Sequence, residues 1–549
     1  MIRLLSLRLF IVFFSMGTLL AQSSLDVSAD DGFINEVIGA DTRANGAQAH
    51  DVYRLTSLNK TYKFTGAILA KSNIRITGVV DAQTGQPPTI QPAILSDFSI
   101  PATFLIAAGA ESNVTIENVY LLAYAADNSV NGDGVAISVT ADKVRLTVEN
   151  SVFDGWQAFA IGYNGQWCDF FINNNTFRNF VHPNQHYIGE VIRNTWPGEA
   201  YTDTLIMRDN VMLCVNGYAA APVTKYYETY FEFVNNKVLY TFKNPFFIFN
   251  VTNAKINDNI FYGTYAGGVD QTENPWWDNL WYPDSSYGVI AFQPLDSANA
   301  SIFAPEFAND PDFLAKAEAK RTIEVKNNSY FWPSELTDFW TNWNNTQSNK
   351  IITPNFMNER TVAMFADKSA YPNLVESNNT NSDPGFMDQI DPDVLNGSDV
   401  DGSIGLLAYF EQIRTGTAAV DYWGYGYTYV DGTDNWTPDW PLPESQYVVT
   451  ALENTARPTL PTAMELHQNY PNPFNPATTI SFNLNKKETI NLVVYNTSGQ
   501  VVKTVLDHVT AEGGYHSVRV DMSGLSSGVY YYRLSSPSKR LTRKMIFLK

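Results

Sequence analysis

One short pattern of apolar and polar positions recurs from about Val114 to Tyr330. Each copy is an alternating apolar stretch, then an Asn, then another apolar residue two places later. Because side chains of a strand point alternately to its two faces, each copy predicts a β-strand with one buried face. The gaps between the shared asparagines are 32, 25, 35, 26, 23 and 69 residues. These residues are Asn118, Asn150, Asn175, Asn210, Asn236, Asn259 and Asn328. A strand that returns at such intervals is typical of a stacked repeat.

An Asn just past a strand predicts a left-handed backbone bend where each coil turns a corner. Its side-chain amide would then bond to the equivalent amide in the next coil. We therefore predict an all-β protein whose main part is a right-handed parallel β-helix, with longer gaps forming loops that leave the stack. An ordinary β-sandwich is the alternative, but it does not account for the regular Asn at the strand ends.

Residues 1–21 are predicted to be a secretory signal peptide. Arg3 and Arg8 give it a positive start, and the apolar run of residues 9–20 is short for a membrane span. Ala21 is a plausible residue before the cleavage site. No later apolar run approaches membrane-spanning length, so we expect no transmembrane segment.

Residues 22–445 form the predicted passenger, the part of the chain that carries the β-helix. Within it, PPTIQPAIL (residues 87–95) is expected to be a loop or a cap over the open end of the stack. A long insertion lies between residues 267 and 320, and PDFLAKAEAKR near its end shows helical signs. Residues 446–465 are interpreted as a linker.

The last 84 residues, 466–549, change in character. Alternating strands and Ser-Gly turns predict a small Ig-like antiparallel β-sandwich. Four motifs follow in order: QNYPNPFNPATTISF, LVVYNTSGQVVKTV, LSSGVYYYRL and KMIFLK. Together they resemble the C-terminal sorting domain of the type IX secretion system of Bacteroidota and related phyla. The resemblance implies contact with that secretion machinery and a secreted or cell-surface destination.

The charge distribution supports two separate roles for passenger and tail. The tail holds ten Lys and Arg residues against four Asp and Glu residues. Without the tail and the two arginines of the signal peptide, 24 basic and 52 acidic residues remain, a net charge near −28. Such an acidic surface repels nucleic acid, which we exclude as a partner, and works against polyanionic glycans. A local basic pocket or a bound Ca²⁺ would reverse this field, and Ca²⁺ is the one cofactor that the sequence leaves open.

A second resemblance concerns catalysis. GEVIRNTW (residues 189–196), followed by LIMRDNVM and YFEFVNN, resembles the chondroitin and alginate lyases of the β-helix type. In those enzymes a Glu-x-Glu pair holds Ca²⁺, a Lys removes the proton next to the uronate carboxylate, and an Arg assists. On this resemblance, Glu190 and Arg193 fit the first phrase, Asn210 fits the strand end, and Lys225 falls near the catalytic Lys.

The sequence departs from this family at two points. Residues 218–221 stand where the Glu-x-Glu pair belongs, and Phe249 and Asn250 stand where the assisting Arg belongs. We therefore predict no metal site, and we expect Glu190 and Arg193 to brace the stack as an ion pair. If the chain is an enzyme, its activity is expected to be polysaccharide lyase-like. Its candidate catalytic residues are Glu190, Arg193, Arg208 and Lys225.

Aromatic residues in the loops are the remaining candidates for a binding site, because sugar rings stack on flat aromatic faces. The predicted substrate-binding residues are Trp276, Trp277, Trp281, Trp423, Tyr425 and Trp436. A further cluster contains Trp332, Trp340 and Trp343. The alternative role for all these rings is to cover the core of the β-helix. Cys168 and Cys214 are expected to be free or buried thiols.

Three functions are consistent with these observations. The first is a secreted or cell-surface β-helix that does not catalyse a reaction and that contacts extracellular polysaccharide or builds surface structure. The second is a polysaccharide lyase or glycoside hydrolase that acts along the β-helix groove. The third is a structural subunit of a fibre or coat that self-associates through its solenoid ends or aromatic loops.

Overall fold

The computed structural model divides into two compact units, Met1–Tyr447 and Val448–Lys549. The predicted signal peptide and residues 446–463 of the predicted linker lie outside the residues that the structure describes, and Glu465, at the end of that linker, belongs to a strand. The described residues are 23–58, 60–82, 85–126, 130–181, 188–195, 201–221, 230–246, 248, 251–270, 287–295, 312–348, 350–384, 403–404, 422–423, 464–466, 469, 474, 477–484, 486–497, 500–511, 514–537 and 539–548.

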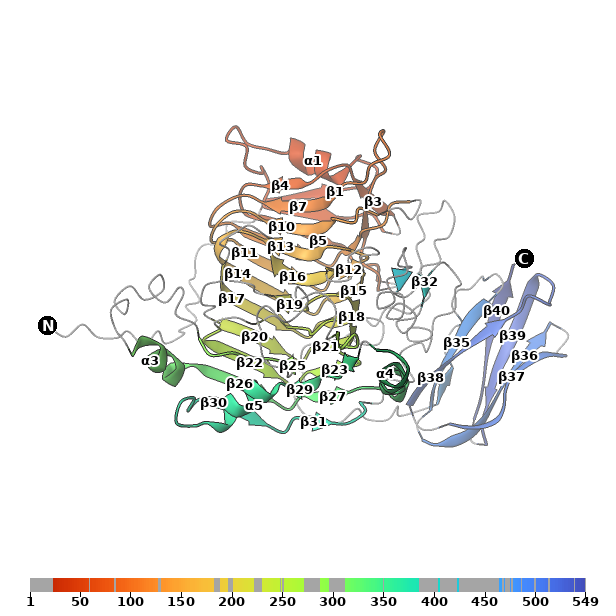
Figure 1. Ribbon diagram of the computed structural model, residues 1–549. Helices are drawn as coiled ribbons and strands as arrows, with labels where there is room; N and C mark the ends of the chain where they lie inside the picture. The colour runs from red at the N-terminus through yellow and green to blue at the C-terminus, as the bar shows by residue number, and fades with distance from the viewer. Residues whose placement is uncertain are drawn as a thin grey trace. The chain divides into compact units, whose positions relative to one another are not determined.

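The first unit is a parallel β-helix, as predicted (Figure 1). Six coils of the described residues contribute one strand each to a six-stranded, an eleven-stranded and a ten-stranded sheet in turn, and the two longer sheets extend beyond these coils at both ends. One coil, for example, is formed by β7 (Thr103–Ala107), β8 (Asn113–Glu117) and β9 (Tyr120–Leu122). Strands of successive coils pair in parallel and in register. The period-two alternation of the sequence therefore places apolar side chains inside every coil.

The three sheets contain the following strands. The eleven-stranded sheet has the order β1 (Ser24–Val27), β2 (Val52–Leu55), β5 (Ile74–Gly78), β8, β11 (Arg145–Glu149), β14 (Gln166–Asn173), β17 (Tyr201–Arg208), β20 (Tyr230–Val234), β22 (Asn253–Asn257), β26 (Thr322–Lys326) and β30 (Leu374–Ser377). The ten-stranded sheet has the order β3 (Thr61–Phe64), β6 (Thr89–Pro92), β9, β12 (Val152–Asp154), β15 (Thr176–Phe180), β18 (Val211–Val215), β21 (Lys237–Thr241), β23 (Ile260–Tyr262), β27 (Ser329–Phe331) and β31 (Thr380–Asn381). The six-stranded sheet contains β4 (Ile68–Ala70), β7, β10 (Val135–Val139), β13 (Phe159–Tyr163), β16 (Glu190–Asn194) and β19 (Ala220–Ala221).

Shorter pairings complete the first unit. They are the antiparallel pair β24 (Val269–Asp270) and β28 (Ile351–Ile352), and the parallel pairs β25 (Gly288–Ile290) with β29 (Asn355–Met357) and β32 (Ser403–Ile404) with β33 (Tyr422–Trp423).

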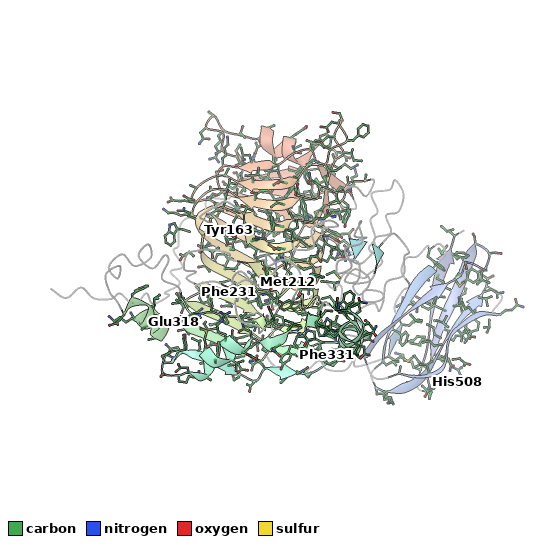
Figure 2. All side chains as sticks on the ribbon, viewed as in Figure 1. Tyr163, Met212, Phe231, Glu318, Phe331 and His508 are labelled. Carbon is green, nitrogen blue, oxygen red and sulfur yellow. The ribbon has the colours of Figure 1, made fainter. Side chains whose placement is uncertain are left out.

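Apolar side chains from all three sheets fill the interior of the coils. Tyr163, Met212 and Phe231 are three of these buried side chains (Figure 2). Aromatic rings of successive coils stack on one another, and the ring centroids of Phe153 and Phe177 are 5.1 Å apart. The apolar side chains of each coil are buried because the neighbouring coils cover them.

A ladder of buried asparagines joins the coils at the corner between the eleven- and ten-stranded sheets. The Oδ1 atom of Asn236 accepts hydrogen bonds from the backbone N and the Nδ2 of Asn210, both at 2.9 Å. Asn236 Nδ2 in turn donates to the backbone O of Met207 at 2.9 Å. The same pattern repeats along the stack through Asn175, Asn210, Asn236, Asn259, Asn328 and Asn379.

The left-handed bend lies one residue earlier than predicted in most coils. At the corner between the eleven- and ten-stranded sheets, the residues with positive φ are Asn118, Asn150, Asn174, Asp209, Asn235, Asp258, Asn327 and Asn378. Asn118 and Asn150 therefore align with Asn174 and not with Asn175. The prediction merged two adjacent positions because either Asn of an Asn-Asn pair fits the local pattern, and only the stacking of the coils distinguishes them.

A helix covers the N-terminal end of the stack, and PPTIQPAIL does not. In α1 (Ile34–Ala40), Ile34 and Ile38 are buried in the main core. The prediction for PPTIQPAIL was wrong, since Thr89–Pro92 form β6, in which Ile90 is buried. Pro92 is tolerated because β9 pairs only with Thr89 and Ile90 of β6, so the ladder on the side that the Pro92 nitrogen faces ends before Pro92.

The described residues in the C-terminal part of the first unit form three more helices. The helical signs in the long insertion are confirmed by α3 (Phe313–Lys320). The side chains of Leu336, Trp340 and Trp343 from α4 (Ser334–Thr346) lie in one buried cluster with residues of β18, β21 and β23. In α5 (Glu359–Ala366), Asn358 Oδ1 caps the N-terminus by accepting from the backbone N of Thr361 at 2.9 Å.

The second unit consists of two antiparallel sheets around a core of its own. One sheet contains β34 (Glu465–Leu466), β35 (Ala477–Leu484) and β38 (Gly514–Asp521). The other has the order β37 (Val501–Ala511), β36 (Glu488–Asn496), β39 (Gly528–Ser535) and β40 (Arg540–Phe547). Two antiparallel sheets around one core form the small β-sandwich that the sequence predicts.

Candidate functional site

Two of the four candidate catalytic residues meet on β16 of the six-stranded sheet. Arg193 Nη1 lies 3.0 Å from Glu190 Oε1 and 3.2 Å from Oε2. Glu190 is fully buried, whereas the Arg193 side chain is partly exposed and its guanidinium lies over the Phe159 ring, 6.0 Å from the centroid. Burial raises the pKa of Glu190 above its ordinary value, and the charges of Arg193 and Lys243 partly offset this rise. Glu190 is therefore held inside the protein by its cationic partners.

Lys243 is the residue of this cluster that sequence reasoning missed. It is buried just after β21, and its Nζ lies 4.9 Å from the centroid of the Tyr218 ring. Its position 53 residues after Glu190 carries no local signal. The resemblance to the lyases places Phe249 and Asn250 at the position of the assisting Arg, whereas Lys243 lies in the preceding Phe-Lys-Asn-Pro phrase.

Gly217 makes room for the Glu190 side chain. A Cβ atom at this position would lie 2.2 Å from Glu190 Cγ, far inside van der Waals contact. Nearby, Asn244 is buried and donates through Nδ2 to the backbone O of Phe246 at 2.6 Å. Its Oδ1 has no hydrogen-bond partner in the structure. The cluster is thus tightly packed, with little space beside the carboxylate.

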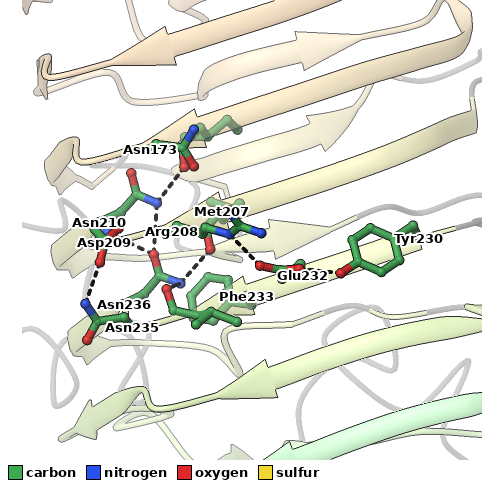
Figure 3. Close-up of polar contacts among 12 residues, drawn as sticks. Asn173, Met207, Arg208, Asp209, Asn210, Tyr230, Glu232, Phe233, Asn235 and Asn236 are labelled. Atoms are coloured by element: carbon green, nitrogen blue, oxygen red, sulfur yellow. Dashed lines mark hydrogen bonds and ion pairs between the residues drawn. The ribbon is translucent and has the colours of Figure 1, made fainter. Parts of the chain in front are cut away.

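Arg208 lies on a different sheet from Glu190 and Arg193. It is the last residue of β17 in the eleven-stranded sheet, where its Nε donates to Glu232 Oε1 (Figure 3). The hydroxyl of Tyr230 donates to the other oxygen of Glu232. Burial would raise the pKa of Glu232, but these two hydrogen bonds outweigh it and lower the pKa below its ordinary value. The structure therefore separates Arg208 from the pair on β16.

The remaining candidates cannot be placed. Lys225 and the predicted binding residues Trp276, Trp277, Trp281, Tyr425 and Trp436 lie outside the described residues. Trp423 belongs to β33, but its side chain is not among those described. In the other aromatic cluster, Trp340 and Trp343 are buried, and Trp340 Nε1 donates to the backbone O of Ala266 at 2.9 Å. These two tryptophans cover the core, which is the second of the two roles considered for the aromatic clusters.

A second buried ionic cluster lies on the ten-stranded sheet. Asp154 Oδ2 accepts from Arg178 Nε at 2.6 Å and from the Tyr120 hydroxyl at 2.5 Å. Arg178 Nη2 donates to the Tyr120 hydroxyl at 2.7 Å, and Asn179 Nδ2 donates to Asp154 Oδ1 at 3.1 Å. All four side chains are buried, and burial raises the pKa of Tyr120. A satisfied network of this kind fixes the local packing and has no access to a ligand.

Neither thiols nor metal ligands form a site in the described part of the chain. Cys168 and Cys214 are free and buried, as expected, and burial raises the pKa of Cys168 to about 11. Among the described residues, no three His, Cys, Asp or Glu side chains are grouped so that they could hold a metal ion. The same residues contain no helix that is long and apolar enough to cross a membrane.

Comparison with known proteins identifies the tail. Residues 468–548 match the family model of the secretion system C-terminal sorting domain. This match confirms the predicted type IX sorting tail and indicates export to the cell surface or the extracellular space. No curated protein and no solved structure matches the chain.

Proposed function

We propose that the passenger is a secreted or cell-surface β-helix that contacts extracellular polysaccharide without cleaving it. Export rests on the sorting tail. One observation argues against cleavage: Glu190 is buried between two cationic side chains. A general acid or base must come within hydrogen-bond distance of the proton that it transfers. Glu190 is fully buried and bound to Arg193, so it is positioned to brace adjoining coils.

Binding of a polymer is supported by the repeat of the fold. Neighbouring strands of a sheet lie about 4.8 Å apart, so outward side chains recur along the solenoid at a spacing close to the length of one sugar ring. A polymer that lies along the axis can therefore repeat the same contact from coil to coil. This multivalent contact needs no deep pocket.

The test is to incubate the full chain with uronate-rich and neutral polysaccharides, with and without Ca²⁺. Binding is followed by affinity electrophoresis, and cleavage is followed by unsaturated and reducing-end products. Saturable binding without products is the expected result. Failure to bind any polysaccharide would overturn the proposal, as would product formation.

A polysaccharide lyase is the second candidate, because Arg193 is partly exposed beside Lys243 in an otherwise acidic passenger. Positive charge at this place is what stabilisation of a uronate carboxylate requires. Product formation that is abolished by Lys225→Ala or Arg193→Ala would establish this second function.

A further inference from the structure

The outward face of the eleven-stranded sheet carries cations and carboxylates on alternating strands. The cations are Arg75 on β5, Arg145 on β11, Arg208 on β17 and Lys255 on β22. The carboxylates are Glu117 on β8, Asp169 on β14, Glu232 on β20 and Glu324 on β26. Asp26, Arg54, Glu149, Asp203 and Lys326 also lie on strands of this sheet and stand outside this alternation. Three cations form ion pairs with the carboxylate of the next strand, at 2.6 Å for Arg75 and Glu117, at 3.8 Å for Arg145 and Asp169, and at hydrogen-bond contact for Arg208 and Glu232.

The two members of each pair differ in what they present to solvent. The side chains of Arg75, Arg145 and Arg208 are 47%, 55% and 48% exposed. Those of their partners Glu117, Asp169 and Glu232 are only 11%, 28% and 6% exposed. A molecule that approaches this face therefore meets guanidinium groups first. The carboxylates lie beneath them.

Two of the guanidinium groups reach one row of the sheet, here called the central row. This central row follows the strand register through Arg75, Phe171, Ile206, Glu232 and Lys255. Although Arg145 starts outside the row, its guanidinium lies over Phe171, 4.8 Å from the ring centroid. Arg208 also starts outside the row, and it reaches Glu232 within it. The central row thus carries Lys255 and receives the guanidinium groups of Arg145 and Arg208, with the half-buried side chains of Phe171 and Ile206 between them. The guanidinium of Arg75 instead pairs with Glu117, which lies in the neighbouring row.

The arginines of the central row keep hydrogen-bond donors free. A guanidinium has five N–H donors in a fixed fork. Arg208 uses only its Nε in the pair with Glu232, and Arg75 uses its Nε and Nη2 with Glu117. The remaining Nη groups are available to a carboxylate, which arginine binds in a bidentate, charge-assisted manner.

We propose that this central row binds a uronate-containing polysaccharide that lies along the solenoid axis. The inference rests on the proposed function and identifies the ligand class and the face. Cationic groups stand on every second strand, so they recur at roughly 9.6 Å, which is on the order of the length of a disaccharide. A polymer with one carboxylate in every disaccharide matches this period. Phe171 and Ile206 offer apolar contact to the sugar rings between the carboxylates.

The charge balance of the face permits this ligand in an acidic protein. The passenger as a whole carries a net charge near −28, which repels polyanions. On the outward face of the eleven-stranded sheet, Glu117, Asp169 and Glu232 are each paired with an arginine that is more exposed than the carboxylate. An acidic polymer that approaches these pairs therefore meets positive charge first.

The test measures binding of the full chain to hyaluronan, alginate and dextran by affinity electrophoresis at low and physiological salt. Arg145→Gln combined with Arg208→Gln is expected to weaken binding to hyaluronan about tenfold or more, since it removes two charge-assisted contacts. The matched control is Arg43→Gln combined with Lys60→Gln, which removes the same charge from exposed positions outside the central row and is expected to leave binding unchanged. Circular dichroism and thermal unfolding verify that both variants are folded.

A third variant distinguishes specific binding of the polymer by Arg208 from a general effect of the protein's charge. Glu232→Gln removes a carboxylate that competes for Arg208, and it is expected to strengthen binding to hyaluronan about twofold or more. Equal binding of hyaluronan by the wild type and by the Arg145 and Arg208 double variant would overturn the inference but leave the proposed function intact. Binding of dextran alone would have the same meaning. Binding of none of the three polymers would overturn both.

Discussion

Replacement of Asn236 by Ala tests whether the buried asparagine ladder holds the coils together. The Asn236 side chain is fully buried and satisfies three groups: the backbone N–H of Asn210, the Nδ2 of Asn210 and the backbone O of Met207. Leaving a buried polar group without a partner costs roughly 1–3 kcal/mol. Three such groups, partly compensated by water in the space left behind, give an expected loss of about 3–5 kcal/mol in the free energy of unfolding.

Asn235→Gly is the matched control, because Asn235 is the adjacent residue of the same corner. It is exposed, has a φ of 56°, and its side chain donates to Asp209, while its backbone N–H donates to the backbone O of Asn257, a bond that glycine retains. Glycine adopts this conformation without strain, so we expect a change within about 1 kcal/mol.

Urea unfolding of the full chain, followed by far-UV circular dichroism, measures both variants, and hydrogen exchange reports on the backbone amide of Asn210. Coils of a solenoid unfold in a coupled manner, so the exchange measurement locates the effect at the ladder. We expect faster exchange of the Asn210 amide in Asn236→Ala alone. If Asn236→Ala were no less stable than Asn235→Gly, or if exchange at Asn210 did not change, the ladder would not carry the energy assigned to it.

Three further predictions concern single positions. Gly217→Ala places a Cβ atom 2.2 Å from Glu190 Cγ and should lower the free energy of unfolding by about 1–3 kcal/mol; a thermal midpoint equal to that of the wild type would contradict this packing. Burial lowers the pKa of Lys237 to about 8, so the protonated side chain destabilises the folded state. This loss of stability is complete below about pH 8, and it fades as the pH rises toward the pKa of the unfolded state, near 10.4. Lys237→Met should therefore be more stable than the wild type by about 1–3 kcal/mol at pH 7, and denaturant titrations at pH 7 and pH 10 should show this difference shrinking; a constant difference would refute the assignment. Cys168 and Cys214 should resist iodoacetamide at pH 8 in the folded chain and react in urea, as measured by mass spectrometry, because burial raises the pKa of both thiols; modification of either one in the native state would contradict their burial.

Local sequence patterns were sufficient to predict the strands, the corners of the coils and the sorting tail. Alternation with period two predicts strands from the inward and outward direction of side chains alone. An Asn that returns every two to three dozen residues predicts the corner of a coil. The tail was recognisable from four motifs in order, and the family match at residues 468–548 confirms it.

The stacking of the coils decided which residues meet. Glu190 and Lys243 are 53 positions apart, and they approach because one coil separates β16 from the turn after β21. Arg208 and Arg193 are only 15 positions apart, yet they lie on different sheets. Sequence distance is a poor guide here, because one coil carries each segment through three faces that point in different directions.

The charged side chains on the eleven-stranded sheet also depend partly on the sequence and partly on the stacking of the coils. Each strand, taken singly, has an ordinary polar outer face, and the sequence therefore determined that Arg75, Arg145, Arg208 and Lys255 point outward. It did not determine that they alternate with carboxylates along one direction, since the loops between these strands differ in length. Register between coils is set by hydrogen bonding and by the buried asparagines, so only the tertiary structure decided which of these side chains meet across neighbouring strands.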